Sequence, residues 1–169
     1  RYPNVYGPRQ NPWGEAGVIS IFTSKMIKNE DIVINGDGKQ QRCFSYIDDC
    51  LYCLNALAFQ DNVVGEVINI GPDEEPITIN ELAEACANET GLNLDPIHHK
   101  DRPKEVKLAV CSSDKARDLL GYSTATNMRQ SVKKTAEYIR TRGTKKVQHH
   151  LPLEIINDQT PDTWKKKLI

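Results

Sequence analysis

Residues 1–10 read RYPNVYGPRQ, and this stretch says more about the fold of the 169-residue chain than any other. It predicts the end of a buried strand that runs into a loop, because Gly7 and Pro8 stop the extended segment that precedes them. Asn4 lies just before that turn. An isolated Asn in this setting more often forms a turn than binds a ligand, although its amide can both donate and accept hydrogen bonds.

The composition is that of a soluble globular protein. The chain is 38% hydrophobic and 27% charged, and its net charge is −1. So small a net charge provides no overall field for binding nucleic acid or an anionic membrane. No apolar run approaches the roughly 20 residues of a membrane-spanning helix. No signal peptide is visible in the sequence, whose first residue is Arg1 and not Met. We therefore expect a cytoplasmic protein.

The cysteines fit the same expectation. Their odd number and apolar neighbours predict reduced, buried thiols. Cys50 and Cys53 have the C-x-x-C spacing of redox and zinc sites, but no second ligand pair has zinc spacing. We favour two small core-facing residues one helical turn apart, and expect no metal site. The five residues are Cys43, Cys50, Cys53, Cys86 and Cys111.

Short strands and amphipathic helices alternate along the chain, which predicts an α/β fold, or α+β for the piece taken alone. Strands are expected over 31–35, 42–47, 66–71 and 96–99. Helices are expected over 16–28 and 50–59. Three more are expected: one from the capping box to near Gly91, a short one capped by Ser112 or Ser113 and stopped by Gly121, and a longer one through Met128 and Ile139 that ends at Gly143. The signals include a capping box at 78–81, a glycine turn at 35–38, and helix-ending glycines at 91, 121 and 143. In helix 50–59, capped by Asp48 and Asp49, the expected inward residues are Leu51, Leu54, Leu57 and Ala58.

Four segments, taken in order, resemble extended short-chain dehydrogenases/reductases of the NAD-dependent epimerase/dehydratase family. Residues 1–10 resemble R-Y-x-N-x-Y-G-P-R-Q, and 34–44 (INGDGKQQRCF) resemble V-Y-G-D-G-x-Q-x-R-D-F. Residues 101–106 (DRPKEV) resemble R-P-G-D, and 113–122 (SDKARDLLGY) resemble D-x-S-K-A-x-x-L-G-W/Y. Residues 2–22 are most similar to the bacterial and archaeal UDP-glucose 4-epimerase group of that family.

The resemblance implies a site for a UDP-sugar. It assigns Arg42 and Arg102 to the diphosphate, which suits the planar fork of a guanidinium. Glu105 would accept hydrogen bonds from ribose hydroxyls. The remaining implied substrate residues are Asn4, Val18, Val33 and Asn35, with the backbone of 33–35 reading the base, and Pro3 is implied at the cofactor.

The chain departs from the family pattern at four of these positions. Asn35 replaces an aromatic residue, which leaves less ring surface near the base. Cys43 replaces an Asp, so we expect Arg42 to have lost a supporting carboxylate. Lys104 and Glu105 replace Gly and Asp, which puts a longer carboxylate on a less permissive backbone.

The implied reaction is transfer of a hydride from C4 of a UDP-hexose to NAD and its return to the opposite face, in an enzyme that acts as a homodimer. Its base is a tyrosine in a Y-x-x-x-K motif, yet none of the six tyrosines here has Lys four residues later. No glycine-rich dinucleotide fingerprint is present either. His98 and His99 suggest a general base by type, but their charged neighbours favour a solvated strand end. We therefore assign no catalytic residue to the chain.

The expected organisation is a substrate-binding portion over 1–143 and a C-terminal extension over 144–169, without the N-terminal NAD-binding Rossmann domain. Trp164 is the large anchor residue of the extension, which has no assigned role. Two alternatives remain open. One is another reaction on the same scaffold, by a 4,6-dehydratase, a decarboxylase or a reductase. The other is a non-catalytic module that binds a nucleotide sugar or scaffolds a partner.

Overall fold

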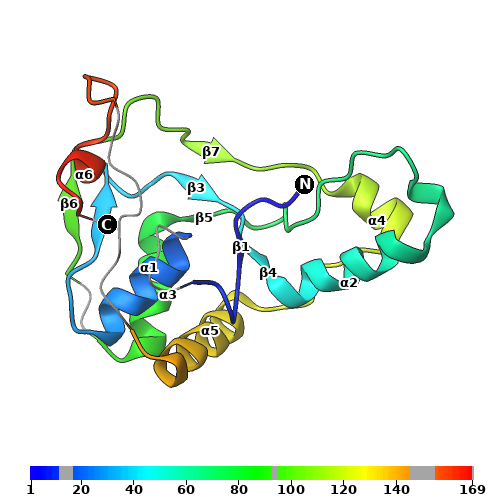
Figure 1. Cartoon of the computed structure of the whole chain (residues 1–169), viewed down its shortest axis with the longest axis horizontal. Coiled ribbons are helices and arrows are strands. Elements are labelled where there is room, and N and C mark those ends of the chain that lie inside the picture. The colour runs from blue at the N-terminus through cyan, green and yellow to red at the C-terminus, as the bar shows by residue number, and fades with distance from the viewer. Residues whose placement is uncertain (12–16, 93–94, 145–154, 169) are drawn as a thin grey trace.

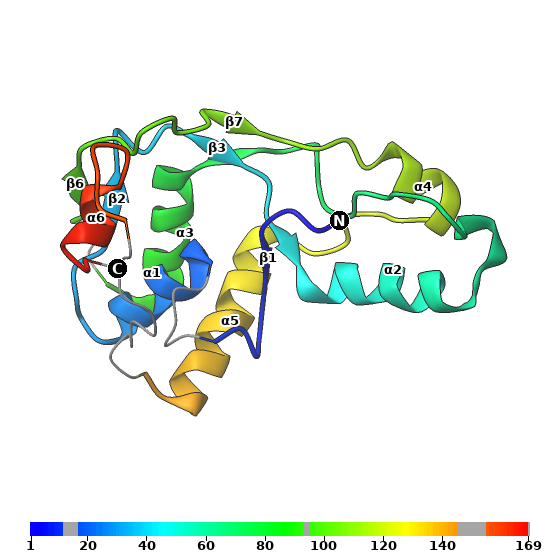
Figure 2. The same cartoon turned by 45° about the horizontal axis from the view of Figure 1, so that its top comes forward.

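The computed structural model describes residues 1–11, 17–92, 95–144 and 155–168. Within them, helices gather at two ends of an elongated molecule, and short strands connect the ends (Figures 1 and 2). The fold is mixed α/β with mostly parallel strand pairs, as the sequence predicts. None of the described helices is both long and apolar enough to cross a bilayer.

The strands form three small sheets. In the first, β1 (Val5–Tyr6) runs parallel to β4 (Ser45–Tyr46). In the second, β2 (Val33–Asn35) runs parallel to β6 (Ile97–His99), with Val33 opposite Ile97. In the third, β3 lies between β5 and β7, and the three strands are β3 (Gln41–Arg42), β5 (Ile77–Thr78) and β7 (Leu108–Ala109). The third sheet brings Arg42 beside the segment that follows residue 100.

The main core lies among three helices, which are α1 (Val18–Ile27), α3 (Ile79–Thr90) and α5 (Met128–Arg142). The predicted capping box starts α3. The backbone N–H of Glu81 donates to Thr78 Oγ1 at 3.1 Å, and the N–H of Thr78 donates to Glu81 Oε2 at 2.7 Å. Gly91 ends the helix with φ 78°. These helices bury Phe22, Leu82 and Val132.

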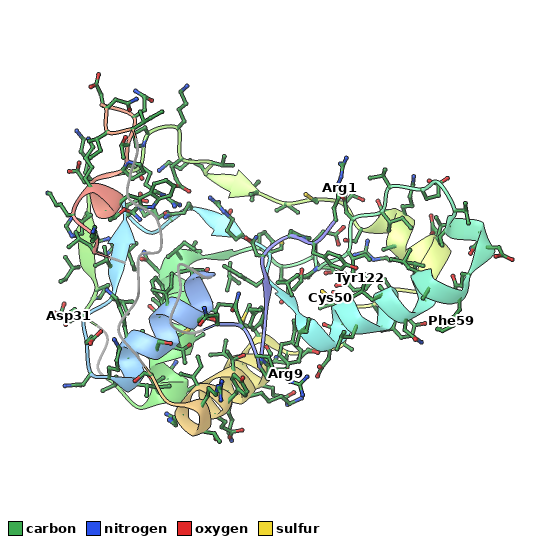
Figure 3. All side chains as sticks on the ribbon, in the orientation of Figure 1. Arg1, Arg9, Asp31, Cys50, Phe59 and Tyr122 are labelled. Carbon is green, nitrogen blue, oxygen red and sulfur yellow. The ribbon has the colours of Figure 1, made fainter. Side chains whose placement is uncertain are left out.

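A second, smaller core lies between α2 (Ile47–Phe59) and α4 (Asp114–Leu120). Figure 3 shows Cys50 close to Tyr122 in this region, and Phe59 at the far end of α2. Cys50 and Cys53 are buried here, as the sequence predicts, and burial raises the pKa of Cys50 to about 11. Short elements complete the chain: a 3-10 turn at Asp61–Val63 and α6 (Asp162–Lys165).

The face of α2 that we predicted to point inward is wrong at three of its four residues. Leu51 is 51% exposed, Leu54 is 44% exposed and Ala58 is exposed too. Leu57 is half-buried and packs against the second core, as predicted. The side that meets α4 carries the two cysteines instead, and α2 is apolar enough all round for either stripe to fit. The helix also begins earlier than expected, at Ile47, so Asp48 and Asp49 lie in its first turn and Tyr46 is its N-cap.

Two further expectations need correction. Residues 66–71 do not form a strand. The N–H of Glu66 donates back to the Val63 carbonyl at 3.1 Å, the N–H of Ile70 donates to the Arg1 carbonyl at 2.9 Å, and the N-terminal ammonium donates to the Ile68 carbonyl at 2.7 Å. Two bonds to one residue make no ladder. Cys111 is exposed, whereas the other four cysteines are buried. None of the five forms a disulfide.

Candidate functional site

One cavity of about 370 Å³ gathers every substrate-binding residue that the sequence predicts. Side chains from α1, β2, β3, the segment after β6 and α6 line it, although these elements are far apart in sequence. The predicted residues around it are Asn4, Val18, Val33, Asn35, Arg42, Arg102 and Glu105. A cavity of this size with a few polar groups is of the kind that holds a small ligand.

Glu105 joins the two predicted arginines. Arg42 Nη2 donates to Glu105 Oε1 at 2.6 Å, and Arg102 Nε donates to Glu105 Oε2 at 2.6 Å. The Glu105 side chain is only 5% exposed, that of Arg42 16% and that of Arg102 38%. Two positive charges and one negative charge leave one net positive charge at the cavity wall. Each guanidinium also has N–H groups beyond those that bind the carboxylate.

A tight turn places Arg102 and Glu105 together. The N–H of Glu105 donates to the carbonyl of Arg102 at 3.2 Å, and Pro103 and Lys104 occupy the two central positions. Lys104 has φ 57°, the left-handed value that a type II turn requires at this point. Lysine therefore occupies the conformation that glycine adopts at no steric cost.

The expected loss of a carboxylate beside Arg42 is therefore wrong. Cys43 carries no charge, but Glu105 supplies the carboxylate from the other side of β3. The parallel pairing of β3 with β7 brings the segment 102–105 within reach. Glu105 thus binds two arginines, whereas the sequence predicted only a role toward ribose.

Another part of the cavity wall is β2, and we call its edge away from β6 the free edge because no strand of the described residues pairs with it. Hydrogen bonds from Ile97 to Ile32 and from Gly36 to His99 show that residues 32 and 36 pair with β6. Successive residues of a strand direct their backbone N–H and C=O groups to opposite edges. The backbone groups of Val33 and Asn35 therefore point away from β6. Gln40 Nε2 donates to the Asn35 carbonyl at 3.0 Å.

Gln40 is a cavity residue that the sequence analysis missed. It is 3% exposed, and its Oε1 has no hydrogen-bond partner among the described residues. The signal was available, because Gln40 matches the Gln of the quoted D-G-x-Q motif. Gly36 and Gly38 adopt φ 74° and 73°, as the turn requires.

Asn4 adopts the backbone conformation of a turn residue. Its φ of 47° lies in the left-handed region, which Asn tolerates better than most residues. Its Nδ2 donates to the Cys43 carbonyl at 2.9 Å, which fixes the amide at the cavity wall. Asn4 is therefore a turn residue whose side chain also lines the cavity.

Other sequence-predicted residues lie outside the cavity. The Pro3 carbonyl accepts from Ser45 Oγ at 2.8 Å, and Pro3 packs against Gly71. His98 is exposed on β6, and its Nδ1 donates to the Gly36 carbonyl at 2.8 Å. Within the described ranges, no group of three or more His, Cys, Asp or Glu side chains is placed to hold a metal ion.

Trp164 of α6 lines the cavity, which the sequence did not predict.

Comparison with known proteins finds a matching family and relatives that align with most of this chain. Residues 1–71 match the NAD dependent epimerase/dehydratase family. UDP-glucose 4-epimerase of Mycolicibacterium smegmatis is 32% identical over 139 residues, which are 82% of this chain and 44% of that protein. The chain therefore spans less than half the length of the curated relatives that it matches.

Solved structures show the same relationship. UDP-glucose 4-epimerase from Thermotoga maritima, crystallised with UDP-glucose, superposes with a TM-score of 0.76 at 38% identity and covers 84% of this chain and 45% of its own. UDP-glucuronic acid 4-epimerase from Bacillus cereus, in complex with UDP-glucuronic acid and NAD, gives 0.76 at 32% identity, covering 85% and 45%. The chain is a partial match to NAD-dependent nucleotide-sugar epimerases.

Proposed function

We propose that residues 1–143 bind a nucleotide sugar, as the substrate-binding portion of a UDP-glucose 4-epimerase-like enzyme. The observation that carries this proposal is the cluster of Arg42 and Arg102 on Glu105, at the wall of a cavity that β2 also lines. Similarity to epimerases that bind UDP-sugars supports it.

The cavity offers a matching group for each part of such a ligand. Arg42 and Arg102 supply charge and their remaining N–H donors to a diphosphate, and Glu105 binds both guanidinium groups. The Val33 and Asn35 backbone provides donors and acceptors for the edge of a base. Asn4 offers an amide to the sugar.

We assign to this chain the binding of the nucleotide sugar, and we assign no step of hydride transfer to it. Its sequence has no Y-x-x-x-K pair and no glycine-rich dinucleotide loop. Pro3, the one residue implied at the cofactor, has no N–H, and its carbonyl already accepts from Ser45. We propose that residues outside this chain carry the NAD site and the catalytic base of the epimerase.

Calorimetric titration of the chain with UDP-glucose tests the proposal. Each charge-assisted contact is worth about 1.5–3 kcal/mol, so Arg42→Ala and Arg102→Ala should each weaken binding about tenfold to a hundredfold. The matched control is Arg129→Ala, because Arg129 is exposed on α5 and pairs only with Glu89 among the described residues. No binding by the parent chain, or equal binding by all four proteins, would reject the proposal.

A further inference from the structure

The C-terminal helix α6 packs against the cavity wall. Figures 1 and 2 show α6 beside β2 and β6, more than 120 residues after β2 in the sequence. Lys25 Nζ of α1 donates to the Leu168 carbonyl at 2.9 Å, which ties the residues after α6 to the cavity side of the molecule. Thr163 is 1% exposed, so α6 is seated against the rest of the fold.

Seating Thr163 places its neighbour Trp164 at the cavity. Trp164 lines the cavity with Val33, Asn35 and Gln40, and 47% of the residue stays exposed. The other rings that line the cavity, Phe22 and Phe44, are only 3% and 7% exposed because they belong to the core. Trp164 is therefore the lining residue whose ring surface is available to a ligand.

The position of the indole indicates which part of a ligand it meets. The free edge of β2 has backbone donors and acceptors but no aromatic side chain, since Val33, Ile34 and Asn35 form that strand. A base can place its polar edge against such a strand, while its flat face still needs a partner. Aromatic rings stack well on bases because every base has a π-face.

We propose that Trp164 is a nucleobase-stacking residue, so that α6 completes the binding site. This inference rests on the proposed nucleotide-sugar function of the same cavity. Trp164 covers the flat face of the base, while Arg42 and Arg102 hold the diphosphate. Affinity for the base therefore depends on Trp164 of α6, whereas affinity for the phosphates does not.

Titrations with UDP and with inorganic pyrophosphate separate these contributions. Stacking losses in alanine variants correspond to about a 5- to 150-fold change in affinity. Trp164→Ala should weaken UDP by that amount and leave pyrophosphate binding unchanged, and Trp164→Phe should keep most of the UDP affinity. Arg42→Ala should weaken both ligands. Thermal melting of each variant checks that it is folded.

Fluorescence provides a second readout that does not depend on a truncated side chain. The chain has two tryptophans, Trp13 and Trp164, so Trp13→Phe leaves the indole of Trp164 as the only one. UDP should quench its emission, and pyrophosphate should not. If UDP binds and Arg42→Ala weakens it while Trp164→Ala and the emission show no effect, the stacking proposal is overturned and the binding function stands. If the parent chain does not bind UDP, both are overturned.

Discussion

At the scale of single residues, Lys104 determines how two arginines reach one carboxylate. Its φ of 57° closes the turn from Arg102 to Glu105, and the turn aligns the carboxylate with both guanidinium groups. The sequence predicted that Arg42 and Arg102 lie in the binding site, because both stand in quoted motifs and a planar guanidinium suits a diphosphate. It did not identify Glu105 as their shared partner, because 63 residues separate Glu105 from Arg42 and only the pairing of β3 with β7 joins them.

Lys104→Gly should leave the free energy of unfolding unchanged or raise it by up to about 1.5 kcal/mol. The left-handed conformation costs about 1–2 kcal/mol for an L-residue, and the greater freedom of glycine in the unfolded chain offsets about 0.5–1 kcal/mol of that gain. Urea unfolding measures the change. Lys133→Gly is the control: Lys133 is exposed in the middle of α5, and glycine there should cost about 1 kcal/mol. Equal destabilisation of both variants would contradict the turn assignment.

At the scale of elements, the ends of α3 were more predictable than the buried face of α2. The Thr78 capping box and Gly91 use local chemistry, so the sequence placed both ends of α3 correctly. The buried face of α2 depends on α4, which packs against it from about 60 residues away. Two-residue strands such as β3 carry no periodic pattern, so the sequence indicated extended segments without their pairing.

Replacing leucines in the two helices separates the predicted face from the observed one. Leu54→Ala on the exposed side of α2 should change the free energy of unfolding by less than about 0.5 kcal/mol. Leu82→Ala, at a residue with 0% exposure in α3, should lower it by about 2–5 kcal/mol. Chemical denaturation of both variants measures the difference. A large loss for Leu54→Ala would restore the inward-leucine arrangement.

Asp73 connects the segment after Gly71 to α4, and this contact depends on pH. The Arg117 guanidinium and the N–H of Ser113, at 2.7 Å, hold the pKa of the Asp73 carboxyl below its ordinary value. A lowered folded-state pKa stabilises the fold above the unfolded-state value of about 3.9. That contribution is lost as pH falls through the folded-state pKa.

Asp73→Asn should therefore lower the melting temperature at pH 7, and the gap from the parent chain should close as the pH falls below about 3.9. Asp118→Asn is the matched control, because Asp118 is an exposed carboxylate of α4, the helix that carries Arg117. This change should have little effect at either pH. Melting curves recorded from pH 7 to pH 3 follow the gap. A gap that stays constant over this range would show that the Asp73 charge makes no contribution.

At the scale of the whole molecule, two cores and three small sheets place a cavity between segments from nearly the full length of the chain. The four motifs predicted which residues would meet, because each occurs in the order of a known arrangement. The sequence did not predict that α6 would join them, since four helical residues have no periodicity and the packing of Thr163 decides where they lie.

The purified chain should not retain NAD. Its sequence has no glycine fingerprint, and Pro3 lies outside the cavity with its carbonyl already bonded. Acid extraction followed by an assay of released dinucleotide measures retention. A stoichiometric amount of NAD would show that the chain holds the cofactor without the usual loop.

The most direct test of the central claim is a crystal structure of the chain with UDP-glucose. We expect the diphosphate at the guanidinium groups of Arg42 and Arg102, and the uracil between the free edge of β2 and the indole of Trp164. A ligand bound away from this cavity, or a diphosphate that contacts neither arginine, would contradict the account.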